Sequence, residues 1–138
     1  MPAPARTSAP RPVDEKLTIN LGVVDLGQID LLVREGFYSN RSDLIRTAIR
    51  RELERHSEVV REAAERRTLV LGIREFTAHE LEAVRDAGEK LVVRVLGLAS
   101  FADDVTPALA LATIESITVL GALHASPALK KALAERLH

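Results

Sequence analysis

The chain has 138 residues, a net charge of −1, 46% hydrophobic residues, 3% aromatic residues and no cysteine. This composition is typical of a soluble globular protein; it excludes disulfides, thiolate metal sites and attraction to nucleic acid through overall basicity. No apolar run approaches the length of a membrane span, and the N-terminus lacks the apolar core of a secretory signal, so we expect no membrane partner and a cytoplasmic location.

The N-terminal residues 1–14 are rich in Pro, Ala and Ser and contain Arg6 and Arg11. Such a composition cannot bury a core and predicts a disordered arm. A solvated tail and a basic arm that touches phosphates both remain open.

A strand is predicted at "KLTINLG", residues 16–22, because polar and apolar side chains alternate strictly there. The polar face consists of Lys16, Thr18 and Asn20, and the apolar face of Leu17, Ile19 and Leu21. No second strand follows nearby, so the backbone N–H and C=O groups of this strand need hydrogen-bond partners from elsewhere.

Two helical stretches follow the predicted strand. The first covers about residues 26–35, with Asp25 as a candidate N-cap and Gly36 as a candidate C-cap. The second begins after Ser39 and Asn40, both good N-caps, and runs from 41 to 67 as one long helix or two nearly continuous ones. Glu and Arg on its outer face indicate a solvated surface.

Strand, helix, turn and helix with an unpaired strand resemble the ribbon–helix–helix family of DNA-binding proteins, the CopG/Arc/MetJ group. The resemblance rests on "KLTINL", on the short helix that ends in "REGFYSN", and on "RSDLIRTAIRREL", and it covers residues 15–56. It implies an intertwined homodimer whose two strands form an antiparallel ribbon. A segment of this size is too small to be stable alone, which favours a shared core. The expected core residues are Leu17, Ile19, Leu21, Leu44, Ile45, Ala48, Ile49 and Leu53.

The resemblance also implies how double-stranded DNA is read. The ribbon would enter the major groove with Lys16, Thr18 and Asn20 facing the bases, since these side chains match guanine, thymine and adenine edges. The N-terminus of the second helix would clamp phosphate, as free N–H groups at helix N-termini do. The residues expected at this clamp are Ser39, Asn40, Arg41 and Ser42.

From residue 68 onward an internal repeat appears. Three apolar runs each end in Val-Leu-Gly, with Gly72, Gly97 and Gly121 spaced 25 and 24 residues apart. A short loop, a Thr or Ser cap and a helix follow each run, which favours three short β/α units with parallel strands. An ordinary small α/β sandwich is the alternative. We interpret the three glycines as turns at strand ends.

No cofactor, metal or catalytic site is expected. The candidate metal ligands show no ligand spacing and are expected to be surface or core residues; they are His56, His79, His124, Asp103 and Asp104. We find no catalytic Ser-His-Asp layout and no phosphate-binding glycine loop, so the protein is not expected to be an enzyme.

The sequence thus predicts an α+β chain with four parts: a disordered arm (1–14), a ribbon–helix–helix domain (15–56), a helical extension or linker (57–67) and a small β/α-repeat domain (68–138). The expected function is a sequence-specific transcriptional regulator, with repression favoured, whose C-terminal domain oligomerises or responds to an effector. That domain would join dimers into tetramers or longer rows. Two alternatives stay open: an antitoxin, and a DNA-organising or segregation protein that polymerises through the repeat.

Overall fold

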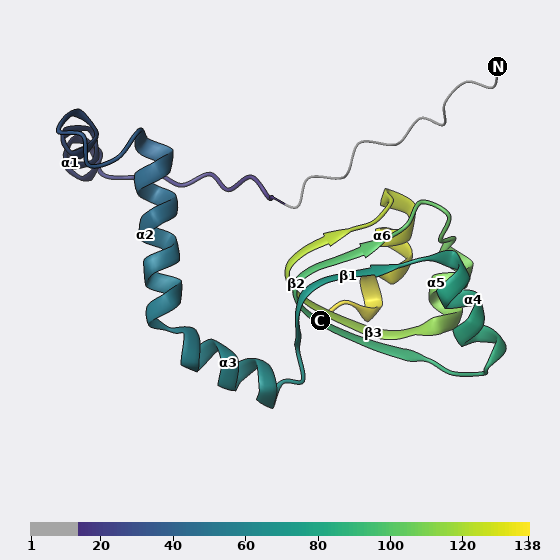
Figure 1. Cartoon of the computed structure of the whole chain (residues 1–138). Coiled ribbons are helices and arrows are strands. Elements are labelled where there is room, and N and C mark those ends of the chain that lie inside the picture. Colours follow the sequence, from purple (N-terminus) through teal and green to yellow (C-terminus); the bar gives the residue numbers. More distant parts are fainter. Residues whose placement is uncertain (1–13) are drawn as a thin grey trace, which may run out of the picture.

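The structure, a computed structural model, describes residues 14–138, and most of the predicted arm falls on residues 1–13, outside the described residues. The N-terminal part contains α1 (Val23–Arg34), α2 (Arg41–Arg55) and α3 (Ser57–Arg66). The C-terminal part contains β1 (Val70–Phe76), α4 (Ala78–Asp86), β2 (Leu91–Phe101), α5 (Pro107–Thr113), β3 (Ile114–His124), α6 (Pro127–Leu133) and a 3-10 turn, η1 (Ala134–Arg136). Figure 1 shows the helices α1–α3 standing beside this sheet-containing part, and the predicted α+β class is confirmed.

The C-terminal part is a stack of three β/α units. Its strands form one parallel sheet in the order β1-β2-β3, and a helix follows each strand. Gly72, Gly97 and Gly121 stand side by side in the register of the sheet. The predicted repeat is therefore present, with its units related by the Val-Leu-Gly spacing.

The three glycines lie inside the strands and not at strand ends, so our interpretation of them as turns was wrong. Their φ angles are +127°, +138° and +123° for Gly72, Gly97 and Gly121. Only glycine adopts this backbone region freely. All three strands change direction at the same register position, so pairing continues through the bend. Figure 1 shows the strands curving round together at one side of the sheet.

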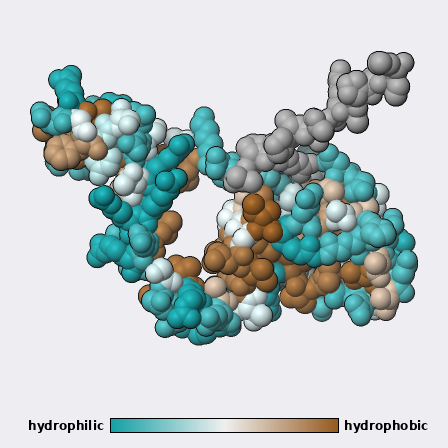
Figure 2. Space-filling view, in the orientation of Figure 1, coloured by the Kyte–Doolittle hydropathy of each residue, from teal (hydrophilic) through white to brown (hydrophobic). Residues whose placement is uncertain are grey.

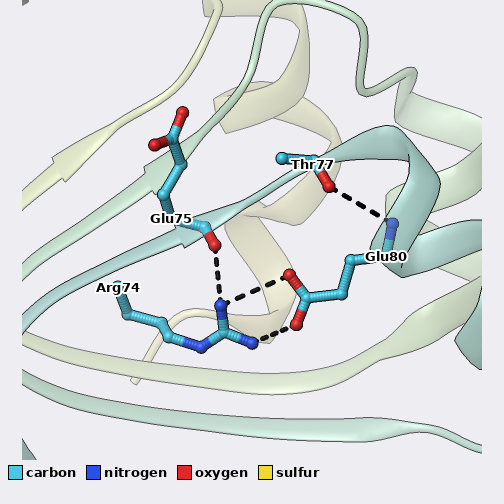
Figure 3. Close-up of polar contacts among 4 residues, drawn as sticks. All are labelled: Arg74, Glu75, Thr77 and Glu80. Carbon is cyan, nitrogen blue, oxygen red and sulfur yellow. Dashed lines mark hydrogen bonds and ion pairs between the residues drawn. The ribbon is translucent and has the colours of Figure 1, made fainter.

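Each repeat helix begins with the hydroxyl cap that the sequence predicts. The side chains of Thr77, Thr106 and Ser126 each accept a hydrogen bond from the backbone N–H three residues later. At the first unit, Arg74 forms an ion pair with Glu80 and donates to the carbonyl of Glu75 at 2.7 Å (Figure 3). The caps thus mark the start of each helix, and the Arg74–Glu80 pair joins β1 to α4.

Among residues 14–138, all buried core residues lie in the C-terminal part. The strands contribute one side of it and the helices α4, α5 and α6 the other, with Phe76 stacked on Phe101 at 5.0 Å between ring centroids. Thr113 is also buried, and its hydroxyl donates to the carbonyl of Leu109 at 2.8 Å. The units bury their apolar residues against one another, as stacked repeats do.

The helices α1, α2 and α3 contain no buried residue. Helix α1 begins at Val23, three residues earlier than predicted, with Gly22 as N-cap, so Asp25 lies in the first turn and is not the cap. Gly36 ends α1 at φ +85° as predicted, with the N–H of Phe37 donating to Leu32. The second helical stretch is two nearly continuous helices that meet at His56.

Candidate nucleic-acid interface

The segment that carries the predicted base contacts lies unpaired in the single chain. Residues 14–22 form neither helix nor strand, and Lys16, Thr18 and Asn20 are exposed. The apolar side is exposed as well: Leu17 is 82% exposed. A side-chain contact joins Glu15 of this segment to His124 of the C-terminal part at 2.8 Å. The segment therefore does not pair with the chain's own sheet, and the strand predicted at 16–22 is not formed by one copy alone.

The predicted phosphate clamp lies at the N-terminus of α2, where the four expected residues come together. Asn40 is the N-cap, and its side chain accepts from the N–H of Asp43 at 2.8 Å. The carboxylate of Asp43 in turn accepts from the N–H of Ser39 at 3.0 Å. Within residues 14–138, the backbone N–H groups of Arg41 and Ser42 donate to no other residue. The first N–H groups of a helix have no partner within the helix, which is why helix N-termini bind anions.

Arg41 also makes a contact that sequence reasoning missed. Its guanidinium grips the carboxylate of Asp30 on α1 in a two-bonded pair, at 2.7 Å and 2.8 Å. The hydrogen bonds and charge of Arg41 hold the pKa of Asp30 below its ordinary value. Both side chains remain about half exposed, so the pair is open to exchange with another anion. The pair joins two helices across a turn, and the periodic spacing of residues within a helix does not predict a contact between helices.

The residues expected to form the dimer core are on the surface of this single chain. Leu44 and Ile45 are half-buried, whereas the other six are exposed: Leu17, Ile19, Leu21, Ala48, Ile49 and Leu53. Exposed apolar residues so close in sequence are typical of a surface that another molecule covers.

A model of the ribbon-helix-helix transcriptional regulator family matches residues 12–130. The chain belongs to this family. The match extends through the β/α units, so the repeat is part of what this family model describes and is not an unrelated addition to residues 15–56. Searches of curated proteins and of solved structures gave no match to the chain.

The residues considered as metal ligands in the sequence make other contacts in the structure. In residues 14–138, no group of three His, Asp or Glu side chains is arranged to hold a metal ion. His56 instead contacts Glu52 at 3.1 Å, and the carboxylate of Asp104 accepts from the N–H of Ala78 at 3.4 Å. Of the helices in this part of the chain, none has the length and apolar character to cross a membrane.

A shallow cavity of about 330 Å³ lies between the end of α3 and the sheet of this regulator. Arg67, Leu69, Arg94, Thr118 and Leu120 line it. Arg94 donates to the backbone carbonyl of Arg67 at 3.3 Å. The cavity is open to solvent and its walls combine two guanidinium groups with apolar side chains.

Proposed function

We propose that this protein is a sequence-specific DNA-binding regulator that acts as a homodimer and represses transcription by covering promoter DNA. Two copies would exchange residues 16–22 to form an antiparallel two-stranded ribbon. The observation that supports this best is the state of the single chain: α1–α3 contain no buried residue, and the preceding segment has no strand partner. A second copy supplies both the missing core and the missing ladder.

In that dimer, alternation sends Leu17, Ile19 and Leu21 against the helices and leaves the polar face outward. The ribbon fits the major groove, where Lys16, Thr18 and Asn20 of each copy reach base edges. The free N–H groups of Arg41 and Ser42 at the start of α2 hold the flanking phosphate, which sets the register of the ribbon on the duplex.

The decisive experiment selects bound fragments from genomic DNA and then measures binding by variants. Asn20→Ala should cost about 1–3 kcal/mol on the selected site and little on random DNA, because base readout is sequence-specific. Gln28→Ala is the matched control, since Gln28 is an exposed amide on α1 outside the ribbon. Equal weakening on both DNAs would contradict base readout by Asn20. A monomer at micromolar concentration in sedimentation would contradict the dimer.

The same experiment separates the two alternative functions. A DNA-organising or segregation protein is supported by the unfinished stack of β/α units, and it would protect long tracts with little sequence preference. An antitoxin needs a segment that folds on a partner protein, whereas the C-terminal part of this chain already has a buried core. Protection that depends on the selected sequence would favour the repressor, whatever the length of the protected tract.

A further inference from the structure

The two ends of the sheet in the C-terminal part differ in a complementary way. Strand β1 has 7 residues and pairs only with the second half of β2, from Val95 to Phe101. At the other end, the first half of β3 is covered by the chain's own C-terminus: Ile117 is bridged to Leu137, and the N–H of His138 donates to the carbonyl of Ile117 at 2.9 Å. The covered part of β3 therefore corresponds to the part that β1 lacks.

Exposure shows that β1 lacks an outer neighbour. Val70 and Val95 share a register position and a face of the sheet, yet Val70 is 62% exposed and Val95 is 2% exposed. Likewise, Ile73 is 65% exposed, whereas its register partner Leu98 is 8% exposed. An apolar edge strand of this kind pairs with another chain unless something blunts it. Figure 2 shows apolar surface gathered on the side of this part where the strands bend.

The bend glycines show the same missing neighbour at atomic level. A Cβ built on Gly121 would lie 2.1 Å from the carbonyl oxygen of Gly97, and one built on Gly97 would lie 2.2 Å from that of Gly72. Gly97 and Gly121 thus each lie against the carbonyl of the glycine in the preceding strand. A Cβ built on Gly72 meets nothing within 4 Å. Within residues 14–138, no strand lies on the outer side of Gly72, so the series begins at Gly72 and ends at Gly121.

We propose that β3 of one copy pairs in parallel with β1 of a second copy, with Gly121 beside Gly72, so that the stack continues from chain to chain. The occupant of the β1 edge is therefore another molecule of this protein. This proposal deepens the proposed function, on which it rests for the purpose of the assembly: linking regulator dimers into rows on DNA.

The side chains that this register brings together match in character. Val70 would lie beside Val119, Leu71 beside Leu120, and Ile73 beside Ala122, which places apolar residues on apolar residues. Glu75 would lie beside His124, which already attracts the carboxylate of Glu15 in the single chain. This register places a carboxylate beside a histidine and apolar side chains beside apolar side chains, which favours it over a shifted register.

The charged side chain of β1 does not obstruct the edge. Arg74 turns toward α4, where it pairs with Glu80 (Figure 3). Its guanidinium carbon lies 4.3 Å from the centre of the Phe76 ring. Its charge is thus compensated within its own unit. An arginine that extended into the edge would have blocked strand addition, as edge charges commonly do.

This contact is head-to-tail and differs in symmetry from the ribbon. A ribbon between two copies has two-fold symmetry and is complete with two chains. A β3-to-β1 contact joins different surfaces of the two chains, so each added chain leaves one β1 edge and one β3 edge free at the ends of the assembly. The two contacts together would produce open rows of dimers.

Disulfide trapping tests the register directly, because the natural chain has no cysteine. Adjacent strands place in-register Cα atoms about 5 Å apart, within disulfide range. A mixture of Ile73→Cys chains and Ala122→Cys chains should give a covalent dimer under mild oxidation, and the double variant should give a ladder of multimers. Ile73→Cys mixed with Leu120→Cys, two residues out of register, should give much less. Covalent dimer from Ile73→Cys alone would overturn the proposal in favour of two-fold β1 pairing, and so would the absence of any ladder.

A charge on the edge provides a second test with a DNA readout. Leu71→Lys should reduce the sedimentation mass to that of the dimer and at least tenfold weaken cooperative filling of adjacent sites, with single-site affinity unchanged. Val92→Lys is the control, because Val92 is an exposed apolar residue of β2 that lies outside the register of the proposed contact. Unchanged cooperativity in Leu71→Lys would overturn the proposal while leaving DNA binding intact. Failure of the wild-type chain to bind DNA would instead refute the proposed function, and the trapping result would stand independently.

Discussion

Replacing the bend glycine Gly97 with alanine tests the stacked architecture most directly. The new Cβ would lie 2.2 Å from the carbonyl oxygen of Gly72 and 3.1 Å from its carbonyl carbon, where contacts under 3.0 Å essentially never occur. Both groups are backbone within one sheet, so the strands themselves must separate locally. In addition, the φ of +138° disfavours any L side chain.

The magnitude follows from these two costs. The backbone region alone costs about 1–3 kcal/mol for a residue with a Cβ. Forcing an extra atom into a packed position costs about 1–3 kcal/mol more, so Gly97→Ala should lose about 2–6 kcal/mol of unfolding free energy. Gly72→Ala is the matched control: its φ is +127°, but its Cβ meets nothing within 4 Å, so only the backbone cost of about 1–3 kcal/mol applies.

The assay is urea unfolding followed by circular dichroism, at a protein concentration low enough that neighbouring chains do not associate through β1. The difference between the two variants isolates the contact between Gly97 and the carbonyl of Gly72. Equal losses of unfolding free energy for Gly97→Ala and Gly72→Ala would refute the reasoning that the glycines of adjacent strands are in close contact.

Three further predictions concern single contacts. Thr68 ends α3 at φ +56°, so Thr68→Gly should raise the urea midpoint by relieving about 1 kcal/mol of strain, and a lowered midpoint would contradict this. Thr106→Ala and Ser126→Ala should each lose about 1 kcal/mol in the same assay, because each removes a helix cap, whereas losses near zero would show the caps to be unimportant. Arg41 lowers the pKa of the Asp30 carboxylate, so this carboxylate should contribute stability above its ordinary pKa and lose that contribution as pH falls through the lowered value. Arg41→Gln should return the pKa of Asp30, measured by NMR, to its ordinary range. An unchanged pKa in this variant would show that Arg41 does not perturb Asp30.

Much of the C-terminal part could be predicted because its signals are local. The Val-Leu-Gly spacing predicted the three units, and the caps at Thr77, Thr106 and Ser126 lie where the sequence places them. The place of the glycines inside the strands could not be predicted, because an apolar run looks the same whether it ends at a glycine or bends there. The sign of φ at Gly97 is set by its neighbour strand, which is 25 residues away in the chain.

The candidate interface was less predictable, for a different reason. Periodicity identified the exposed polar side chains of residues 16–22 and the caps of α2, but it carries no information on contacts between elements. The pairing of Arg41 with Asp30 spans 11 residues and two helices, and the contact of Glu15 with His124 joins the two ends of the chain. The placement of Lys16, Thr18 and Asn20 on DNA stays a prediction.

The two unfinished surfaces of this chain imply an order of assembly. The helices α1–α3 bury nothing alone, so the ribbon dimer would be obligatory and would form at low concentration. The C-terminal part has its own buried core, and β1, the edge strand that would be covered, has only 7 residues, so β3-to-β1 pairing is optional and should be weak in solution. DNA changes this balance, because dimers on adjacent sites raise the effective concentration of one another's edges. Rows should therefore appear on DNA at protein concentrations where free dimers do not associate, and the length of the row would be set by the number of adjacent sites.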